Sequence, residues 1–485
     1  MRRHLLGPLR LTPLRVAALA PLCVALGCGG AAEPEDGAAG DGGEPPHIVL
    51  VLIDTLRADH TSLYGYERPT TPHMERIAEV GLVGDRHFVN APWTKPSIAS
   101  ILTGLHPTAH GSRVGQFSQG KGKNAPQVDI LSDAHWTFVE LLQQAGYRTL
   151  AHTSNYNMNP DWGYAQGYDR YEFAHGSNRK RTIANDRASR DFVFDALESA
   201  DGPTFVWAHM MGVHQYFAPE EFLRFEPDGA TPVDMTTPGA RRVEQFETIE
   251  NSVAQYDNSI LFDDDLVGQI YDRIVEQHPN TILIVTSDHG EEFMDHGAWE
   301  HCSTLYNEML KVPLLMVGPG VPEGVRVDGI TDSLDLFPSI LALAGLDVDE
   351  LPRAGQPIVE DGAPTDGKSE TFAEQHHRGP FVRFALNRNG KKLIRSHKKR
   401  WKESGDARIG PVTSTEWYDN AWTVETDDMV FQPTPDEAKD FFARVERFRE
   451  ATTLWFEREV GEQAVGTVSA EDLKKLQALG YGGGD

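Results

Sequence analysis

A threonine at position 94 lies in a segment whose composition suits the binding of negative charge. Residues 91–111 read APWTKPSIASILTGLHPTAHG, and their spacing predicts a short helix that begins just after Thr94. Pro96 falls in its first turn, where a missing N–H costs no hydrogen bond. The free N–H groups and the dipole of a helix start attract anions. Taken alone the pattern favours a simple N-cap, but the rest of the chain indicates that the Thr94 hydroxyl faces an anion site.

Acids and histidines lie at the ends of three predicted strands. Apolar runs at 47–53, 204–210 and 281–287 predict buried strands. Asp54 directly follows the first run, and His209 lies near the end of the second. The pair Asp288 and His289 directly follows the third. Ligands of open α/β sheets bind outside the carboxyl ends of strands, so we expect these side chains to converge.

The order of these motifs resembles that of sulfatases and the wider alkaline phosphatase superfamily. There the nucleophile segment reads C-x-P-S-R or S-x-P-S-R, and its first residue is converted to formylglycine. Here Thr94 holds that place and Ile98 stands where the arginine would be, so formylglycine is not expected. Residues 53–81 resemble the N-terminal signature of the family, with Thr55 at a position where a second acid is common.

The resemblance implies a divalent metal ion held by Asp54, Thr94, Asp288 and His289. Because of Thr55, one ligand of the usual calcium set is missing. An Asp-His pair suits zinc or manganese better than calcium, which prefers oxygen ligands. We therefore expect Zn or Mn, with Ca as the alternative.

Two further histidines receive roles from the resemblance. The H-x-M-G-x-H spacing that ends at His214 is similar to that of phosphoethanolamine transferases and lipoteichoic acid synthases, where the second histidine contacts the anionic group of the substrate. His301 lies thirteen residues after Asp288, as in those transferases. We expect His214 to bind the substrate anion and His301 to protonate the leaving oxygen.

The other candidates for substrate binding are weaker, because a lone histidine is more often packed or at the surface than functional. They are His209, His296, Lys95 and Arg57. Arg57 could hold the substrate or the nucleophile, but an ion pair with Asp59 or Glu75 is an equal alternative.

The residue type at position 94 favours phosphoryl over sulfuryl transfer. A threonine hydroxyl becomes a useful nucleophile when a cation lowers its pKa. Phospho-threonine can be opened by water or another alcohol in a second displacement. Sulfo-threonine lacks the second hydroxyl with which hydrated formylglycine expels sulfate. We therefore predict a metal-dependent hydrolase of phosphate or phosphonate esters or diesters. The alternatives are a sulfuric ester hydrolase, a phosphoethanolamine-type transferase and a non-catalytic binding lipoprotein.

The N-terminus predicts export. Basic residues precede an apolar run at 16–26, as in a secretory signal peptide, and the following Gly-Cys resembles a bacterial lipobox that would place lipid on Cys28. We expect a lipoprotein signal at 1–28, a flexible linker at 29–46, and a protein that is periplasmic or at the cell surface. Cys302 then has no disulfide partner.

The elements that must position these residues alternate between apolar strands and helical periods, which predicts an α/β fold with a mainly parallel sheet between helices at 47–350. Further predicted strands lie at 147–153 and 312–317. Helices are predicted at 72–80, 97–102, 135–145, 246–277 and 333–344, and the acidic run 263–265 is expected to face solvent.

Residues 368–485 are expected to form a small α+β subdomain with a tail. In this part of the chain a hairpin turns at Asn389-Gly390 within 382–396, and a helix follows at 435–457. The net charge of -27 indicates that nucleic acid is not a partner and that the membrane is reached only through the N-terminal lipid. An anionic ester substrate therefore needs local cations.

Overall fold

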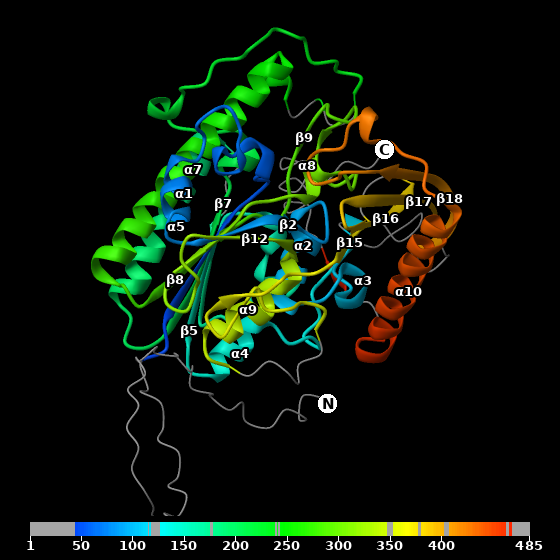
Figure 1. Ribbon diagram of the computed structural model, residues 1–485. Helices are drawn as coiled ribbons and strands as arrows, with labels where there is room; N and C mark the ends of the chain where they lie inside the picture. Colours follow the sequence, from blue (N-terminus) through cyan, green and yellow to red (C-terminus); the bar gives the residue numbers. More distant parts are fainter. Residues whose placement is uncertain are drawn as a thin grey trace, which may run out of the picture.

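The structure is a computed structural model (Figure 1). It describes residues 44–114, 116–117, 127–174, 178–237, 240, 243–346, 353–376, 380–401, 407–461 and 465–467. Cys28 with its signal peptide, most of the linker and the tail from 468 lie outside the described residues, so those assignments stay predictions.

An eight-stranded sheet forms the centre of the larger domain. Its spatial order is β12-β2-β11-β8-β1-β7-β5-β6. Only β11 runs antiparallel to its neighbours, and the other pairs are parallel, which confirms the expected mainly parallel sheet. The strands are β1 (His47–Ile53), β2 (Leu82–Phe88), β5 (Arg148–Thr153), β6 (Arg170–Phe173), β7 (Thr204–Met210), β8 (Thr281–Thr286), β11 (Leu314–Val317) and β12 (Val325–Asp332).

Helices cover both faces of this sheet. Alternate residues of β1 pack into two separate apolar cores, so both faces of the strand are buried. In Figure 1, α1, α5 and α7 lie on one side of the sheet and α2, α4 and α9 on the other. The six helices are α1 (Pro72–Ala78), α2 (Thr94–Thr103), α4 (Phe138–Gln144), α5 (Arg179–Glu198), α7 (Ile249–Gln277) and α9 (Leu336–Leu343).

The C-terminal subdomain is a four-stranded antiparallel sheet with a long helix on one face. Its hairpin turns at Asn389-Gly390, where φ values of 52 and 78 degrees give the left-handed turn that this dipeptide favours. Helix α10 begins with a capping box between Thr434 and Glu437. The elements are β15 (Glu370–Gln375), β16 (Phe381–Arg388), β17 (Lys391–Trp401), β18 (Ala407–Tyr418) and α10 (Pro435–Glu459).

Short elements complete the described part of the chain. The short helices are α3 (Pro107–His110), α6 (Gly212–Gln215) and α8 (Asn307–Leu310), with 3-10 turns at η1 (Ala58–His60), η2 (Ser62–Tyr64), η3 (Tyr156–Met158), η4 (Pro160–Trp162), η5 (Glu220–Phe222), η7 (Glu244–Phe246), η8 (Ser333–Asp335) and η9 (Asp427–Met429). The short strands are β3 (Gln116–Phe117), β4 (Gln127–Asp129), β9 (Glu292–Phe293), β10 (Trp299–Glu300), β13 (Val359–Glu360), β14 (Ala363–Pro364) and β19 (Val465–Thr467). None of the described helices combines the length and the apolar composition needed to cross a membrane.

One prediction about α7 is wrong. The acidic run at 263–265 was expected to face solvent, but the side chains of Asp263 and Asp264 are fully buried. Asp264 accepts hydrogen bonds from the backbone N–H groups of His73 and Met74, so it satisfies the start of α1 from a neighbouring helix. Asp263 packs beside Asp186 of α5 under Gly212. Tertiary capping and burial therefore outweigh the preference of an acidic run for water.

Candidate active site and metal centre

Three neighbouring strands bring the strand-end residues together. Strand β1 lies between β8 and β7, and Leu52 of β1 is in register with His209 of β7. Asp54 follows β1, and Asp288 and His289 follow β8. All four of these functional side chains are fully buried. The parallel arrangement thus places one acid, one histidine and one acid-histidine pair at a single edge of the sheet.

Asp54 lies at the centre of this group. His209 Nε2 is 3.1 Å from Asp54 Oδ2, and His289 Nε2 is 3.6 Å from Asp54 Oδ1 and 3.4 Å from Asp288 Oδ2. Ligand atoms of Asp54, His209 and Asp288 all lie within 4.8 Å of one another. His209, assigned above to substrate binding, is therefore placed as well for a cation as the predicted ligand His289.

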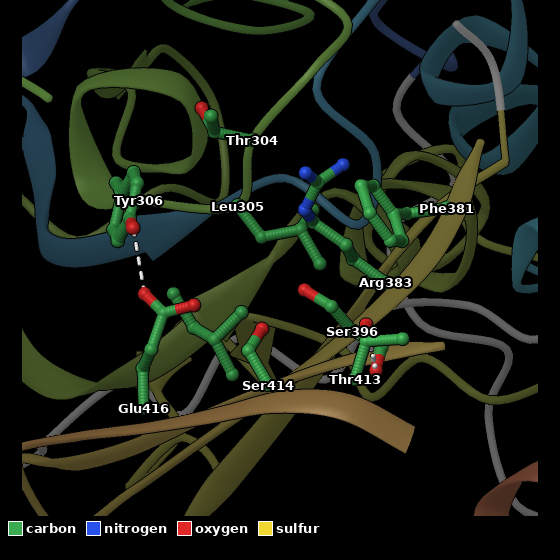
Figure 2. A pocket seen from close by; sticks show the side chains of 10 residues that line it. Thr304, Leu305, Tyr306, Phe381, Arg383, Ser396, Thr413, Ser414 and Glu416 are labelled. Atoms are coloured by element: carbon green, nitrogen blue, oxygen red, sulfur yellow. Dashed lines mark hydrogen bonds between the residues drawn. The ribbon is translucent and has the colours of Figure 1, made fainter. Parts of the chain in front are cut away.

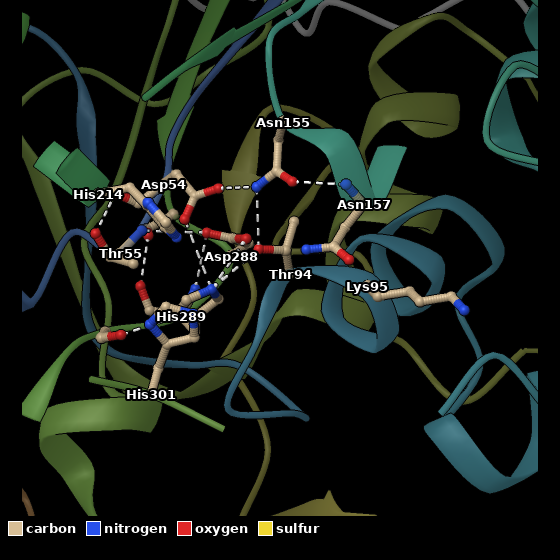
Figure 3. Close-up of polar contacts among 12 residues, drawn as sticks. Asp54, Thr55, Thr94, Lys95, Asn155, Asn157, His214, Asp288, His289 and His301 are labelled. Atoms are coloured by element: carbon tan, nitrogen blue, oxygen red, sulfur yellow. Dashed lines mark hydrogen bonds and ion pairs between the residues drawn. The ribbon is translucent and has the colours of Figure 1, made fainter. Parts of the chain in front are cut away.

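Thr94 joins the group from the start of α2 (Figure 3). In the structure Thr94 is the first residue of the helix and Trp93 is its N-cap, whereas the sequence pattern predicts a helix that begins just after Thr94. Its Oγ1 lies 3.2 Å from His289 Nε2. Thr94, the predicted nucleophile, is thus brought together with the other three predicted metal ligands, Asp54, Asp288 and His289.

Asn155 is a site residue that the sequence reasoning missed. It follows β5, and its Nδ2 donates to Asp54 Oδ2 at 2.5 Å and to Thr94 Oγ1 at 3.2 Å. Its own Oδ1 accepts from the Asn157 N–H at 2.8 Å, which fixes the orientation of the amide. The rule that singled out Asp54 could have found Asn155, since the strand that precedes it was predicted.

The charges of the two acids indicate that the site fits a cation. Asp54 Oδ1 and Asp288 Oδ2 are buried and accept no hydrogen bond from the described residues. Burial and the charge of Asp54 raise the pKa of Asp288 to about 6. Burial alone would also raise the pKa of Asp54, but nearby His214 and the contact with His209 outweigh it and hold that pKa well below its usual range. Two buried carboxylates this close are costly unless a positive ion offsets them.

Two histidines lie next to the acids. The ring of His301 is 4.5 Å from that of His289 and 5.2 Å from that of His214, measured between centroids. Nδ1 of His301 lies 3.0 Å from Glu291 Oε1, so this carboxylate orients the ring and favours a proton on Nδ1. Figure 3 shows His214 beside Asp54 and His301 below His289. Glu291 is a second residue that the sequence reasoning did not identify.

Three of the weaker substrate-binding candidates have other partners. Lys95 Nζ points away from Thr94 (Figure 3) and is bound by the carbonyl and the carboxylate of Asp129, the latter at 2.9 Å. Arg57 forms ion pairs with Asp59 at 2.7 Å and Asp295 at 2.9 Å.

The Arg57 pairing is the alternative that the sequence left open. The same guanidinium also donates to the carbonyl of Glu291 at 2.9 Å, so Arg57 supports the residue that orients His301. His296 Nδ1 lies 2.8 Å from Glu308 Oε1, and its ring stacks on Tyr306. The structure therefore assigns Lys95, Arg57 and His296 structural contacts rather than direct contacts with Thr94.

The chain is similar to known proteins over most of its described length. Residues 46–346, more than half of the chain, match a family model described as Sulfatase. The phosphoethanolamine transferase EptC of Escherichia coli K12 is 25% identical over 264 residues, which cover 52% of this chain but only 41% of the transferase.

Two solved structures share the fold across most of the chain. The 2-O GAG sulfatase BT1596 has a TM-score of 0.64 at 16% identity, covering 91% of this chain and 98% of its own. The phosphonate monoester hydrolase of Silicibacter pomeroyi has a TM-score of 0.62 at 19% identity, covering 84% of this chain and 95% of its own. Such similarity includes the C-terminal subdomain as well as the central sheet.

Proposed function

The chain belongs to the sulfatase family, and from this premise we propose that it hydrolyses phosphate or phosphonate esters, diesters included, with Thr94 as the nucleophile. Membership supports the broader statement that the chain is a metal-dependent hydrolase acting on sulfate or phosphate esters. The narrower choice between these esters depends on the chemistry of residue 94.

The hydroxyl of Thr94 is the observation that carries this proposal. It lies at the start of a helix, within 3.2 Å of both His289 Nε2 and Asn155 Nδ2. Threonine cannot supply the hydrated aldehyde with which formylglycine releases sulfate. A phosphorylated threonine can be opened by water, so the hydroxyl favours phosphorus over sulfur as the reacting centre.

Asp54, Thr94, Asp288 and His289 would hold the divalent cation, with His209 as a further donor beside Asp54. Oxygen and nitrogen donors together fit Zn or Mn better than Ca. A bound cation supplies positive charge that lowers the pKa of a hydroxyl and offsets the charge of an anionic ester.

The protein side chains account for the remaining steps. Thr94 releases its hydroxyl proton to solvent, and its Oγ1 attacks phosphorus in line with the leaving oxygen. The P–O bond to the leaving group breaks as His301 transfers its proton to that oxygen. His214 and Asn155 contact the substrate and the nucleophile, respectively. A water molecule then attacks phospho-Thr94, and His301 takes a proton from the water. The bond between phosphorus and Thr94 Oγ1 breaks, phosphate leaves, and Thr94 takes a proton from solvent to restore its hydroxyl. Each displacement thus uses one proton that His301 gives and later recovers.

We further propose that lipid on Cys28 attaches the protein to a membrane, and that the protein is located in the periplasm or at the cell surface. The sequence pattern at 16–28 supports it.

Two neighbouring activities are the main competitors. Sulfate ester hydrolysis is supported by the match of residues 46–346 to the family model described as Sulfatase. Transfer of phosphoethanolamine is supported by the relative EptC and by the spacing of His209 and His214. A non-catalytic binding lipoprotein is the remaining alternative, and it requires that the contacts of Thr94 serve no turnover.

The test compares para-nitrophenyl phosphate, bis(para-nitrophenyl) phosphate and para-nitrophenyl sulfate as substrates. Protein loaded with Zn or Mn should hydrolyse a phosphoester, and Thr94→Ala should lower kcat by about 1,000-fold or more, because the nucleophile is lost. Thr94→Ser keeps a hydroxyl and should retain measurable turnover.

Other outcomes decide between the competitors. Faster hydrolysis of the sulfate would overturn the argument from threonine chemistry. Turnover that appears only when an alcohol acceptor is supplied would favour the transferase. No measurable hydrolysis of any of the three esters by protein that has bound metal would favour a binding protein.

A further inference from the structure

Thr55 adopts a backbone conformation that its side chain disfavours. Its φ value is 62 degrees, in the left-handed region that glycine enters freely. For a β-branched residue such a value is a genuine outlier. Relaxation out of it is favoured by about 5- to 150-fold unless the surroundings hold the residue there. Because Thr55 is fully buried and directly follows Asp54, this strain lies at the edge of the proposed cation site.

The strained conformation aims the Thr55 N–H at one of the two acids. That N–H donates to Asp288 Oδ1 at 3.3 Å, while Asp288 Oδ2 is buried and accepts no hydrogen bond from the described residues. One oxygen of the carboxylate is thus engaged by the backbone, and the other is left for a cation. The geometry of the acid pair therefore depends on the backbone at position 55.

The Tyr256 hydroxyl is the group that holds this backbone. It donates to the Thr55 carbonyl at 2.7 Å and accepts from the Arg57 N–H at 2.9 Å, so one oxygen joins the chain on both sides of Leu56. The N–H and the carbonyl of Thr55, which lie on opposite sides of its Cα, are then both fixed by hydrogen bonds. Rotation to an ordinary φ value breaks at least one of them.

Tyr256 is a rigid support for these bonds. It belongs to the long helix α7, and its side chain is fully buried. The centre of its ring lies 5.6 Å from that of Tyr216 and 4.8 Å from that of Phe293, both in edge contacts. Burial raises the pKa of its phenol well above the usual range, so the hydroxyl keeps the proton that it donates.

Tyr306 shows why burial matters for this role. Its hydroxyl donates to Glu416 Oε2 at 2.6 Å on the wall of a cavity of about 230 Å³ (Figure 2). Thr413, on the same wall, is exposed, so water can replace a partner that is lost there. Thr55 and Tyr256 are fully buried and do not line this cavity. Loss of the bond between them therefore costs more than loss of a bond that water can reach.

We propose that Tyr256 is a positioning residue for the cation site, and that its hydroxyl keeps Thr55 in the left-handed conformation that sets Asp54 and Asp288 around one divalent ion. Tyr256 acts through Thr55 and not on the reacting atoms. Without the hydroxyl, only the fraction of molecules in which Thr55 stays strained is competent to bind the ion. This inference rests on the proposed function, because it takes the two carboxylates as ligands of the cation used there.

The test measures the Kd for Mn²⁺ and for Zn²⁺ by isothermal titration calorimetry on the whole protein after treatment with EDTA. Tyr256→Phe should raise Kd by about 5- to 150-fold, the factor by which relaxation of Thr55 lowers the competent fraction. In a protein that also carries Thr55→Gly, Kd should return to within about threefold of that of Thr55→Gly alone, because glycine adopts this φ value without strain. A loss of packing at Tyr256 would not be relieved in this way.

Tyr64→Phe is the matched control. The Tyr64 hydroxyl also joins two backbone groups, since it donates to the Gly84 carbonyl at 2.7 Å and accepts from the Leu314 N–H at 3.0 Å. These groups belong to β2 and β11, which carry none of the residues assigned to the site. Tyr64→Phe should therefore lose a comparable bond and keep the wild-type Kd for both ions.

Three results would overturn the proposal: a Kd that Tyr256→Phe leaves unchanged, a rise in Kd that Thr55→Gly does not reverse, or an equal rise in Tyr64→Phe. Where Tyr256→Phe does not fold, Thr55→Gly is compared with Thr55→Ala, since both lose the hydroxyl that donates to the Asp54 carbonyl. Thr55→Gly should have the higher midpoint of thermal unfolding, because alanine stays strained at positive φ. The opposite order would also overturn the proposal.

The outcome is separable from that of the proposed function. A Kd that does not depend on Tyr256, in a protein with Thr94-dependent phosphoester turnover, refutes only the positioning role. Binding that depends on Tyr256, in a protein without turnover, refutes only the proposed reaction. A wild-type protein that binds neither ion refutes both.

Discussion

Replacement of Asn155 tests whether the contacts around Thr94 are used in the reaction. Asn155→Ala removes two hydrogen bonds, one to the Asp54 carboxylate and one to the Thr94 hydroxyl. Bonds to ionised groups contribute about 1.5–3 kcal/mol and neutral ones about 0.5–1.5 kcal/mol. If both persist in the transition state, their loss costs about 2–4.5 kcal/mol, which is about 30- to 2,000-fold in kcat/KM.

The assay is kcat/KM for whichever para-nitrophenyl ester the wild-type protein hydrolyses, together with the midpoint of thermal unfolding. Asn159→Ala is the control, because Asn159 lies in the same segment and its side chain accepts from the Asp161 N–H. It should leave kcat/KM within about threefold of wild type, since that side chain makes no contact with Thr94 or Asp54. Asn155→Ala with unchanged kcat/KM and unchanged stability would refute the assigned contacts.

Asn155→Asp separates the donor from the shape of the side chain. At neutral pH its carboxylate would face Asp54 without a proton to donate, so activity should be as low as in Asn155→Ala. At pH 5 a protonated carboxyl could donate to Asp54 again. We therefore expect the activity of Asn155→Asp, relative to wild type at the same pH, to rise on acidification, whereas that of Asn155→Ala should not.

The remaining predictions concern two buried charges. Lys95→Met leaves Asp129 without its buried cation, so the free energy of unfolding in urea should fall by about 3–5 kcal/mol, while KM stays within about twofold of wild type; a tenfold rise in KM would return Lys95 to substrate binding. Burial raises the pKa of Asp186 to about 7 from an unfolded value near 4. A raised folded pKa favours the folded state fully only below about pH 4, and this contribution is lost as the pH rises through about 7. Asp186→Asn keeps the acceptor for the Met211 N–H, so it should be more stable than wild type at pH 8, by on the order of a few kcal/mol, but not at pH 4; an equal difference in thermal unfolding at both pH values would contradict this cause.

The parts of the fold that could be predicted are those whose burial is apolar. Strands β1, β7 and β8 are predominantly apolar runs, and their bounds were predicted to within one residue. Helix α5 was not predicted, because its inward face carries polar residues such as Thr182 and Ser189 beside Phe192. Strand β2 was missed because the partly exposed Asp85 and Arg86 interrupt its apolar residues. A buried polar side chain leaves no periodic signal in the sequence.

The parts of the site that could be predicted are those at strand ends, because parallel strands bring their carboxyl ends to one edge. Lys95 shows the limit of reasoning from adjacency. Successive residues of a helix point about 100 degrees apart, so once Thr94 is the first residue of α2, its neighbour cannot face the same space. The partner of Lys95, Asp129, lies far along the chain, and no local pattern indicates that pairing.

The departures from the family pattern at positions 55 and 98 are consistent with one another. Thr55 is buried beside the two acids, and its N–H donates to Asp288 Oδ1 at 3.3 Å. An acid at this position would add a third carboxylate where the pKa of Asp288 is already raised by burial and by Asp54. Threonine at position 55 therefore keeps the negative charge around the proposed cation site lower than an acid would.

Ile98 affects the positive charge of the site rather than the negative charge. It is fully buried in the apolar core, so the chain has no arginine at the position from which the family pattern would supply a cation next to the nucleophile. Fewer acids at the metal and no arginine beside Thr94 leave the local charge closer to neutral. In the proposed reaction, the positive charge that meets an anionic ester therefore comes from the bound cation and from His214 and His301, because the chain offers no arginine at position 98.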